Sequence, residues 1–372
     1  MQGQWIGKYE GSTGGSIIFN IDELEEGYSG VAHLLPDDGN LPRVAATLDT
    51  PDKKSPFKAR THGLFAFEPN GVIPLPWKDA KQHFPADVTF SSYADVQGEW
   101  DEKSLTLEWK NDFGAVGHCV LPRSRAAEPS ELPVKEMSWN DFKNHLDTLK
   151  TRALIFRGQA QPWRLRSRYH RTGRSNLYRY RNEDIIQLHR RLSARTSHLF
   201  DLNEPDDFGA FCSIVQHHGY PTPMLDWSKS PYVAAFFAYR TVTHEDVAKR
   251  GANAKVRIHV FDHQRWTMNY PQFPLMLFPN LHISVLEFVP MENERLIPQQ
   301  SMSTLTNVDD IETYIRDKEP ESKTVYLSAY DLPVSERKKV MRELSYMGIT
   351  AGSLFPGHDG ACEELRERNF DV

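Results

Sequence analysis

Apolar and polar side chains alternate over short stretches in the first 120 residues, which is typical of strands with one buried face. The alternation is clearest at residues 5–9 and 104–109, and residues 17–19 add a β-branched and aromatic run. Turn-forming residues separate these stretches, and no helical period lies between them. We therefore predict an all-β module over residues 1–122, an antiparallel barrel or sandwich in which nothing points to catalysis.

The pattern changes beyond this module. Proline, serine and charged residues are frequent from residue 122 to 133, which is typical of an interdomain linker, and we place the linker at 123–135. Farther on, helical periods and short apolar runs are mixed. We predict that residues 136–372 form a domain of α+β type.

Caps and periodicity indicate the elements of this domain. Ser138 is the expected N-cap of its first helix, Pro231 suits the first turn of a buried helix, and Ser335 caps a late helix. We expect helices at 138–148, 183–199, 208–218, 232–241 and 335–346, and strands at 153–156, 255–261, 282–289, 302–306 and 324–328.

The composition excludes several classes of protein. Of the 372 residues 39% are hydrophobic, which excludes wholesale disorder, and no apolar run reaches the roughly 18 residues of a membrane span. Residues 1–5 lack the pattern of a secretory signal. Because Cys119, Cys212 and Cys362 are far apart, we expect neither a disulfide framework nor a zinc site, and we expect a cytoplasmic protein with no membrane partner.

The net charge of −6 hides an uneven distribution. Residues 151–200 contain 12 arginines and no lysine, against the two carboxylates of Glu183 and Asp184. Arginine pairs bidentately with phosphate, and tyrosines interleave with this arginine block, so the block suits phosphate contact combined with base stacking. The residues that we expect to contact nucleotide or nucleic-acid phosphate are Arg164, Arg166, Arg168 and Arg171. In the alternative, the block is a solvated helix face that acids neutralise, and those acids are Asp201, Glu204, Asp206 and Asp207.

Two short motifs carry most of the candidate chemistry. Arg157 closes an apolar strand, and Gly158 after it allows a ligand to approach the backbone. Asp226 and Ser228 precede the apolar helix, where a hydroxyl and free N–H groups would receive an anion. Two alternatives stay open: Arg157 forms a buried ion pair with Asp226, and Ser228 is a plain N-cap.

The adjacent pair His217 and His218 does not predict a metal site. Neighbouring histidines on a helix point about 100° apart, so they cannot chelate as an i,i+4 pair does. We expect no bound metal, and we expect His217 to form a hydrogen bond within the site.

The order of motifs in the second region is similar to that of the FRG domain family, over roughly residues 136–372. The motifs are Phe156-Arg157-Gly158-Gln159 with Trp163, Gln216-His217-His218-Gly219, Pro221-Thr222, Leu225-Asp226-Trp227-Ser228 and Asn293, Arg295 and Gln299. A more distant resemblance, to the ADP-ribosyltransferase fold, implies NAD as the cofactor.

This distant resemblance also implies roles for individual residues. Arg157 would hold the phosphate or ribose of NAD, Ser228 the nicotinamide side, and Gln299 stands where a glutamate is expected. Glutamine cannot act as a general base, and the neighbouring Glu292 and Glu294 are candidate substitutes. The further residues that we expect to contact the cofactor are Gly158, Gln159, His217, Thr222, Asp226, Trp227, Asn293 and Arg295.

The leading expectation is an ADP-ribosyltransferase-like effector that binds NAD and modifies a macromolecule, with nucleic acid as a candidate target. One alternative is a non-enzymatic module that binds a nucleotide or a nucleic acid. The other is a structural interaction protein that uses the β-module, whose partner the sequence does not indicate.

Overall fold

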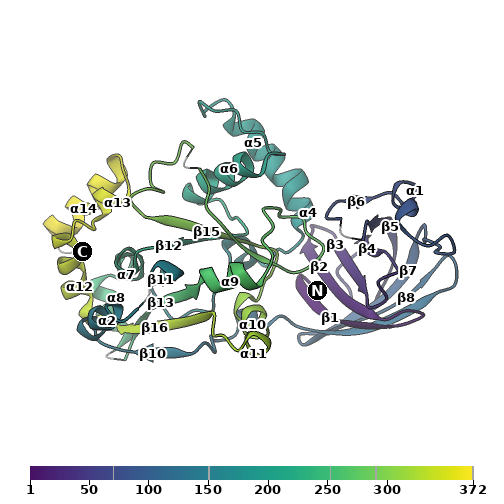
Figure 1. Ribbon diagram of the computed structural model, residues 1–372, viewed down its shortest axis with the longest axis horizontal. Coiled ribbons are helices and arrows are strands. Elements are labelled where there is room, and N and C mark those ends of the chain that lie inside the picture. The colour runs from purple at the N-terminus through teal and green to yellow at the C-terminus, as the bar shows by residue number, and fades with distance from the viewer. Residues whose placement is uncertain (70, 150, 252, 290, 371–372) are drawn as a thin grey trace.

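The computed structural model describes residues 1–69, 71–149, 151–251, 253–289 and 291–370. It contains two sheets, one in each of two units that lie side by side (Figure 1). The N-terminal strands, purple to blue, form the right-hand unit, and the C-terminal helices, yellow, lie at the far side of the left-hand unit. In the part of the chain that is described, no helix is long and apolar enough to cross a membrane.

The N-terminal unit is a closed antiparallel barrel, one of the two architectures, barrel or sandwich, that the sequence predicts. Eight strands follow one another in the order β4-β3-β2-β1-β9-β8-β7-β5, the pairing of β4 with β5 closes the ring, and β6 adds to the edge of β5. The strands are β1 (Gly3–Gly11), β2 (Gly15–Glu23), β3 (Tyr28–Pro36), β4 (Arg43–Asp49), β5 (Phe57–Phe67), β6 (Pro74–Leu75), β7 (Ala94–Trp100), β8 (Ser104–Asn111) and β9 (Val116–Pro122), with helix α1 (Trp77–Ala80) between β6 and β7.

Side-chain alternation builds the barrel as the sequence pattern predicts. Successive residues of β9 are exposed and buried in turn, so that Cys119 and Leu121 point inward while Val120 points to solvent. Trp5 and Phe19 join them in one buried cluster. Burial of each large apolar side chain contributes about 2 kcal/mol, and this interior holds the ring together.

The C-terminal unit contains a mixed sheet with helices on both faces, which confirms the α+β prediction. Its strands follow the order β10-β16-β13-β11-β12-β15-β14, and only β10 and β16 run parallel among the described pairs. The strands are β10 (Val134–Glu136), β11 (Leu154–Gln159), β12 (Met224–Ser228), β13 (Lys255–Asp262), β14 (Ile283–Leu286), β15 (Ser301–Thr306) and β16 (Leu327–Pro333).

Neighbouring residues of β11 show how this sheet separates two cores. Phe156 packs in a cluster with α2, α7 and α12, whereas Ile155 packs on the opposite face with α9 and α10. The helices are α2 (Trp139–Leu146), α3 (Arg168–Arg171), α4 (Leu177–Arg179), α5 (Ile185–Leu192), α6 (Pro205–His217), α7 (Pro231–Arg240), α8 (His244–Arg250), α9 (His263–Asn269), α10 (Ile311–Arg316), α11 (Glu319–Ser322), α12 (Arg337–Tyr346), α13 (Ala351–Leu354) and α14 (His358–Phe370).

Several predicted elements are displaced. Helix α6 begins at Pro205 rather than at 208, and β14 ends at Leu286 rather than at 289. Strand β16 begins at Leu327 rather than at 324, because its register is set by pairing of Leu327 with Phe261. Ser335 lies in a 3-10 turn, and α12 begins after Glu336 without a side-chain cap. The predicted helix 183–199 is regular only in α5, which follows a π-helical turn at Tyr180–Asp184.

The segment expected as a linker is attached to the C-terminal unit. The Ser124 hydroxyl donates to Asp309 at 2.9 Å, and the Ser130 hydroxyl donates to Glu312 at 2.8 Å. Strand β10 begins within the segment and pairs with β16. These contacts hold the segment along the surface because the buried residues Asp309 and Glu312 accept from its hydroxyl groups.

Part of the arginine block joins the two units. The buried Asp22 of β2 accepts hydrogen bonds from the main chain of Ser175 at 2.8 Å and of Asn176 at 3.0 Å, and from Arg174 Nε at 2.7 Å. Tyr178 packs nearby against apolar residues on the outside of the barrel. This buried carboxylate therefore requires the C-terminal unit as its partner.

Candidate functional site

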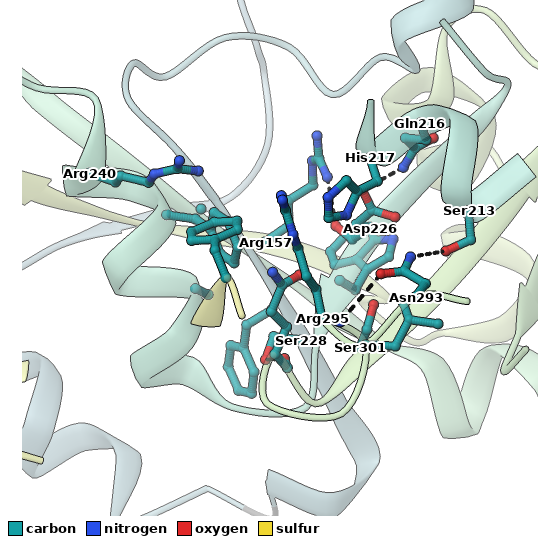
Figure 2. Close-up of a pocket in the computed structure, with 18 residues that line it drawn as sticks. Arg157, Ser213, Gln216, His217, Asp226, Ser228, Arg240, Asn293, Arg295 and Ser301 are labelled. Atoms are coloured by element: carbon teal, nitrogen blue, oxygen red, sulfur yellow. Dashed lines mark hydrogen bonds between the residues drawn. The ribbon is translucent and has the colours of Figure 1, made fainter. Parts of the chain in front are cut away.

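A cavity of about 410 Å³ opens in the C-terminal unit, at the meeting point of β11, β12, α6, α7 and the segment that leads into β15 (Figure 2). The sequence predicted nine of the residues that line it, namely Arg157, Gly158, His217, Asp226, Trp227, Ser228, Asn293, Arg295 and Gln299. These residues come from four separate parts of the chain, so the tertiary fold brings the motifs together.

Two predicted contact residues lie behind the cavity wall instead. The buried Gln159 donates from Nε2 to the carbonyl of Trp163 at 2.9 Å. The Thr222 hydroxyl donates to Gln216 Oε1, and Gln216 Nε2 in turn donates to the Asp226 carboxylate. Thr222 therefore orients Gln216. Gln216 lines the cavity, whereas Thr222 does not.

Arg157 is held by the neighbouring strand. Its Nη1 donates to the main-chain carbonyl of Asp226 at 2.6 Å, and its buried Nε has no hydrogen-bond partner. The sequence left open an ion pair between Arg157 and the Asp226 carboxylate. In the structure Arg157 contacts the main-chain carbonyl of Asp226 instead. Desolvation lowers the pKa of Arg157 to about 10 against the opposing attraction of Asp226, so the guanidinium stays cationic at neutral pH.

Gly158 serves packing. A Cβ atom at this position would lie 1.9 Å from the Ala234 carbonyl oxygen and 2.5 Å from the Ala238 amide nitrogen. Glycine is therefore needed for α7 to lie close against β11, and Gly158 also lines the cavity, so the expectation that it lets a ligand approach the backbone stays a prediction.

Asp226 supplies the single carboxylate among the described residues that line the cavity. Burial raises the pKa of this carboxyl, while Arg157 and the hydrogen bond from Gln216 act in the opposite direction. The carboxylate thus faces the cavity beside a fixed cation, a position from which it can accept a hydrogen bond from a ligand hydroxyl.

Ser228 and Gln299 are joined through the main chain. Ser228 Oγ donates to the Gln299 carbonyl at 2.7 Å and accepts from the Ser230 amide at 3.0 Å. The N-cap of α7 is Ser230, whose side chain accepts from Val233 N, so the alternative that Ser228 is the plain N-cap is wrong. The side-chain nitrogen Nε2 of Gln299 donates to the Leu354 carbonyl at 2.9 Å, and this bond connects the segment that leads into β15 with α13.

Neither candidate substitute for a catalytic glutamate reaches the cavity. Glu292 accepts from Ser197 Oγ and from the His198 amide, and Glu294 is exposed. Both lie outside the set of residues that line the cavity. Their carboxylates belong to the surface, which leaves Asp226 as the acid of the site.

The cavity has an excess of positive charge. Arg240 stacks over the Phe355 ring, and Glu363 neutralises it. Arg295 also lies over Phe355, at 5.1 Å from the ring centroid, but has no carboxylate within 4 Å among the described residues. Burial lowers the pKa of Arg295. With Arg157, two guanidinium groups are available to an anionic ligand.

His217 lines the cavity as a neutral imidazole. Burial, and then the charge of Arg295, lowers the pKa of His217 to about 4. Among the described residues its ring forms no hydrogen bond, so the expected bond within the site is missing from the protein alone. No group of three or more histidine, cysteine or acidic residues that could hold a metal is present in the described ranges.

Half of the predicted phosphate-contacting arginines are already paired. Arg164 forms a bidentate pair with Asp310 at 2.9 and 3.0 Å, and Arg166 pairs with Asp309. The acids that neutralise Arg164 and Arg166 therefore lie about 140 residues away along the chain, and not at 201–207 as the alternative expected. Arg168 is exposed.

Arg171 lines a separate surface hollow that also contains Trp163. Burial lowers its pKa, and the nearby Arg168 and Arg166 lower it further. Arg168 and Arg171 have no ion pair among the described residues, so they are the members of the predicted set that remain available to phosphate.

Sequence reasoning missed several lining residues. Arg240 lies at the end of an apolar helix that carries no polar motif, and Phe355 was not chosen as a site residue. Ser213 is buried in α6 beside Asn293, which donates to it at 2.9 Å. Gln216 belonged to a recognised motif and was not chosen. A helical period counted from His217 places Ser213 four residues earlier on the same face, which is the signal that identifies it.

Comparison with known families identifies a match within this region. A family model of the FRG domain matches residues 152–247, which include β11, α6, β12 and α7 with the residues that they contribute to the cavity. In comparisons with curated proteins and with solved structures, nothing matched this chain.

Proposed function

We propose that this chain, which carries an FRG domain at residues 152–247, binds NAD in the cavity around Arg157 and acts as an ADP-ribosyltransferase-like effector. The observation that supports the proposal is the pair of unneutralised guanidinium groups, Arg157 and Arg295, at one cavity. The orphaned Nε of Arg157 is a buried donor whose partner the protein does not provide. A phosphate oxygen satisfies both its charge and its hydrogen-bonding capacity.

The size and walls of the cavity also suit a nucleotide. Its volume of about 410 Å³ lies within the range of small-molecule sites. Phe237 and Phe355 contribute aromatic surface against which a planar ring can pack. Asn293 and Ser301 add polar groups at the wall.

When bound, NAD would supply an ADP-ribosyl group by loss of nicotinamide. Arg157 and Arg295 would hold the diphosphate, and the neutral His217 would accept or donate a hydrogen bond without adding charge. Asp226 would accept from a ribose hydroxyl and oppose the positive charge that develops as the glycosidic bond loosens. In this assignment Asp226 takes the role for which the distant resemblance indicated a glutamate at the position of Gln299.

A second candidate is a non-enzymatic nucleotide-binding module. The observation that favours it is that the Ser228 hydroxyl and the Gln299 amide are both engaged within the protein. These two groups would then hold the cavity in shape, and the arginines would supply affinity alone.

Calorimetric titration with NAD tests the binding. We expect wild type to bind, and Arg157→Ala to bind at least about tenfold more weakly, which corresponds to the loss of one charge-assisted hydrogen bond. Arg190→Ala, an exposed arginine on α5, is the matched control and should bind as wild type does. Absence of heat with wild type would contradict the proposal.

Release of nicotinamide separates the two candidates. The assay is run with wild type and Asp226→Asn, with and without added RNA, because Arg168 and Arg171 beside the exposed Trp163 suit phosphate contact and stacking. Release that falls by about a hundredfold or more in Asp226→Asn, while NAD affinity is retained, supports the transferase. Binding with no release under either condition supports the non-enzymatic module.

A further inference from the structure

The barrel contains a cavity of its own, with a volume of about 460 Å³. Its walls come from all eight strands of the ring, β1, β2, β3, β4, β5, β7, β8 and β9, and from residues 87–91, which precede β7. It shares no lining residue with the Arg157 cavity, and it lies outside residues 152–247. The nucleotide-binding proposal therefore does not account for it.

The distribution of side-chain size explains why the barrel is hollow at one end. Toward the end where β2 meets β3, Tyr28 and Phe57 pack against Trp100 with ring centroids 5.6 and 5.9 Å apart. Toward the other end, inward positions hold small side chains, which include Ala32 and Ala46. An eight-stranded barrel is just wide enough to be filled by side chains, so small residues in this half leave room for one small ligand.

The hollow end is open to solvent through an apolar rim. Phe113 and Val116, in and after the turn between β8 and β9, are 61% and 50% exposed and also line the cavity. Ser12 and Leu41 line it from the β1–β2 and β3–β4 turns. Single apolar side chains on a surface are normal, but a group of them around the mouth of a cavity indicates a binding entrance, because contiguous apolar surface marks interaction sites.

The walls define the chemistry of an occupant. Among the described lining residues Asp87 is the single charged one, and it is exposed at the rim. No arginine, lysine or histidine of the described chain lines the cavity, so a buried anion would have no partner. The rings of Tyr9 and Trp109, with centroids 5.8 Å apart, form an aromatic wall. Thr61 Oγ1 already accepts a hydrogen bond from Ala94 N, so the Thr61 hydroxyl can donate its proton to one acceptor atom of a ligand.

We propose that the barrel is a binding site for a neutral, largely apolar small molecule, which enters between the β1–β2, β3–β4 and β8–β9 turns. The volume of about 460 Å³ lies within the range of small-molecule sites, so a small molecule is the expected occupant. The absence of a cation among its described lining residues sets the site apart from one for fatty acids or nucleotides.

Fluorescence titration of the full chain with N-phenyl-1-naphthylamine, a neutral apolar dye, tests the site. We expect saturable binding by wild type. Ala46→Phe on β4 and Val96→Phe on β7 place a ring inside the cavity and should each weaken binding at least about tenfold. Val120→Phe adds the same ring at a position that is 63% exposed on the outside of the barrel, and it should bind as wild type does.

Two results would overturn the proposal: no saturable binding by wild type, or equal binding by wild type and both filled variants. Two variants that fill the cavity, Ala46→Phe and Val96→Phe, are used so that the test remains valid if one of them misfolds. A thermal melt shows which variants are folded. Arg157→Ala should leave dye binding unchanged, so this outcome is independent of the NAD experiments.

Competition with two ten-carbon compounds tests the expected lack of charge. We expect 1-decanol to displace the dye, and decanoate to need a concentration at least about tenfold higher, because its carboxylate finds no cation in the wall. Equal displacement by the alcohol and the acid would contradict a site for neutral ligands.

Discussion

Arg157 donates to a main-chain carbonyl, and this contact decides how its charge is used. Had the guanidinium paired with the Asp226 carboxylate, the two charges would cancel and the cavity would lose its main anion-binding group. Instead the carboxylate accepts from Gln216, and the cation and the acid both stay available. Arg295 adds a second cation whose guanidinium is supported by the Phe355 ring.

The glycine beside Arg157 gives a stability prediction at the same scale. Gly158→Ala should destabilise the protein by about 1–3 kcal/mol, because its Cβ would meet the main chain of Ala234, which cannot move without shifting α7. Gly39→Ala, where no atom lies within 4 Å of the added Cβ, should change the free energy of unfolding by less than about 0.5 kcal/mol. Urea unfolding of both variants measures the difference, and equal effects would show that the strand–helix contact tolerates a methyl group.

At the scale of elements, the arginine block is largely a set of structural anchors. Arg164 and Arg166 attach the chain before α3 to the carboxylates that precede α10, and Arg174 attaches the chain after α3 to the barrel. Asp309, Asp310 and Asp22, which neutralise these three arginines, lie more than 140 residues away in the sequence, so only the tertiary contacts reveal the pairing.

Arg164→Ala should destabilise the protein by about 3 kcal/mol, because it removes a buried bidentate partner and leaves Asp310 with an uncompensated charge. Arg168→Ala, at an exposed position on α3, should change the free energy of unfolding by less than about 0.5 kcal/mol. Chemical denaturation of the two variants is the measurement. A loss below about 1 kcal/mol for Arg164→Ala would mean that water replaces the ion pair.

At the scale of the whole molecule, the two units share a polar contact around Asp22 and an aromatic contact around His33. The His33 ring is 3% exposed, and its Nε2 lies 3.4 Å from the Tyr178 hydroxyl oxygen. The ring of Phe67 lies on the same surface. Because the described contacts of His33 include no carboxylate, a positive charge on this imidazole would be unsupported in the folded protein.

This contact makes the folded protein sensitive to acid. Burial lowers the pKa of His33 to about 4, whereas an unfolded histidine has a pKa near 6.5, so the unfolded chain binds more protons between these values. The free energy of unfolding should therefore fall as the pH falls from about 6.5 to 4, by about 3 kcal/mol for this group. His33→Gln should show a smaller loss than wild type in urea unfolding at pH 7 and 4.5. The exposed control His118→Gln should lose as much as wild type, and an unchanged loss in His33→Gln would contradict the assignment.

The sequence by itself determined the local elements and most members of the candidate site. Period-two alternation, caps and the prolines that start helices are local signals, and they predicted an antiparallel barrel or sandwich, the strand that ends at Arg157 and the helix after Pro231. The ordered motifs also identified nine residues that line one cavity.

Only the tertiary structure decided how those residues are used. Whether Arg157 meets a carboxylate or a carbonyl, whether Arg164 faces solvent or Asp310, and whether Gly158 packs against α7 all depend on neighbours brought close by folding. The hollow of the barrel likewise depends on which inward side chains stand at the same height in different strands. Such contacts join positions that are far apart in the chain. The hydrophobic pattern shows which face of an element is buried, but it does not show which other element packs against that face.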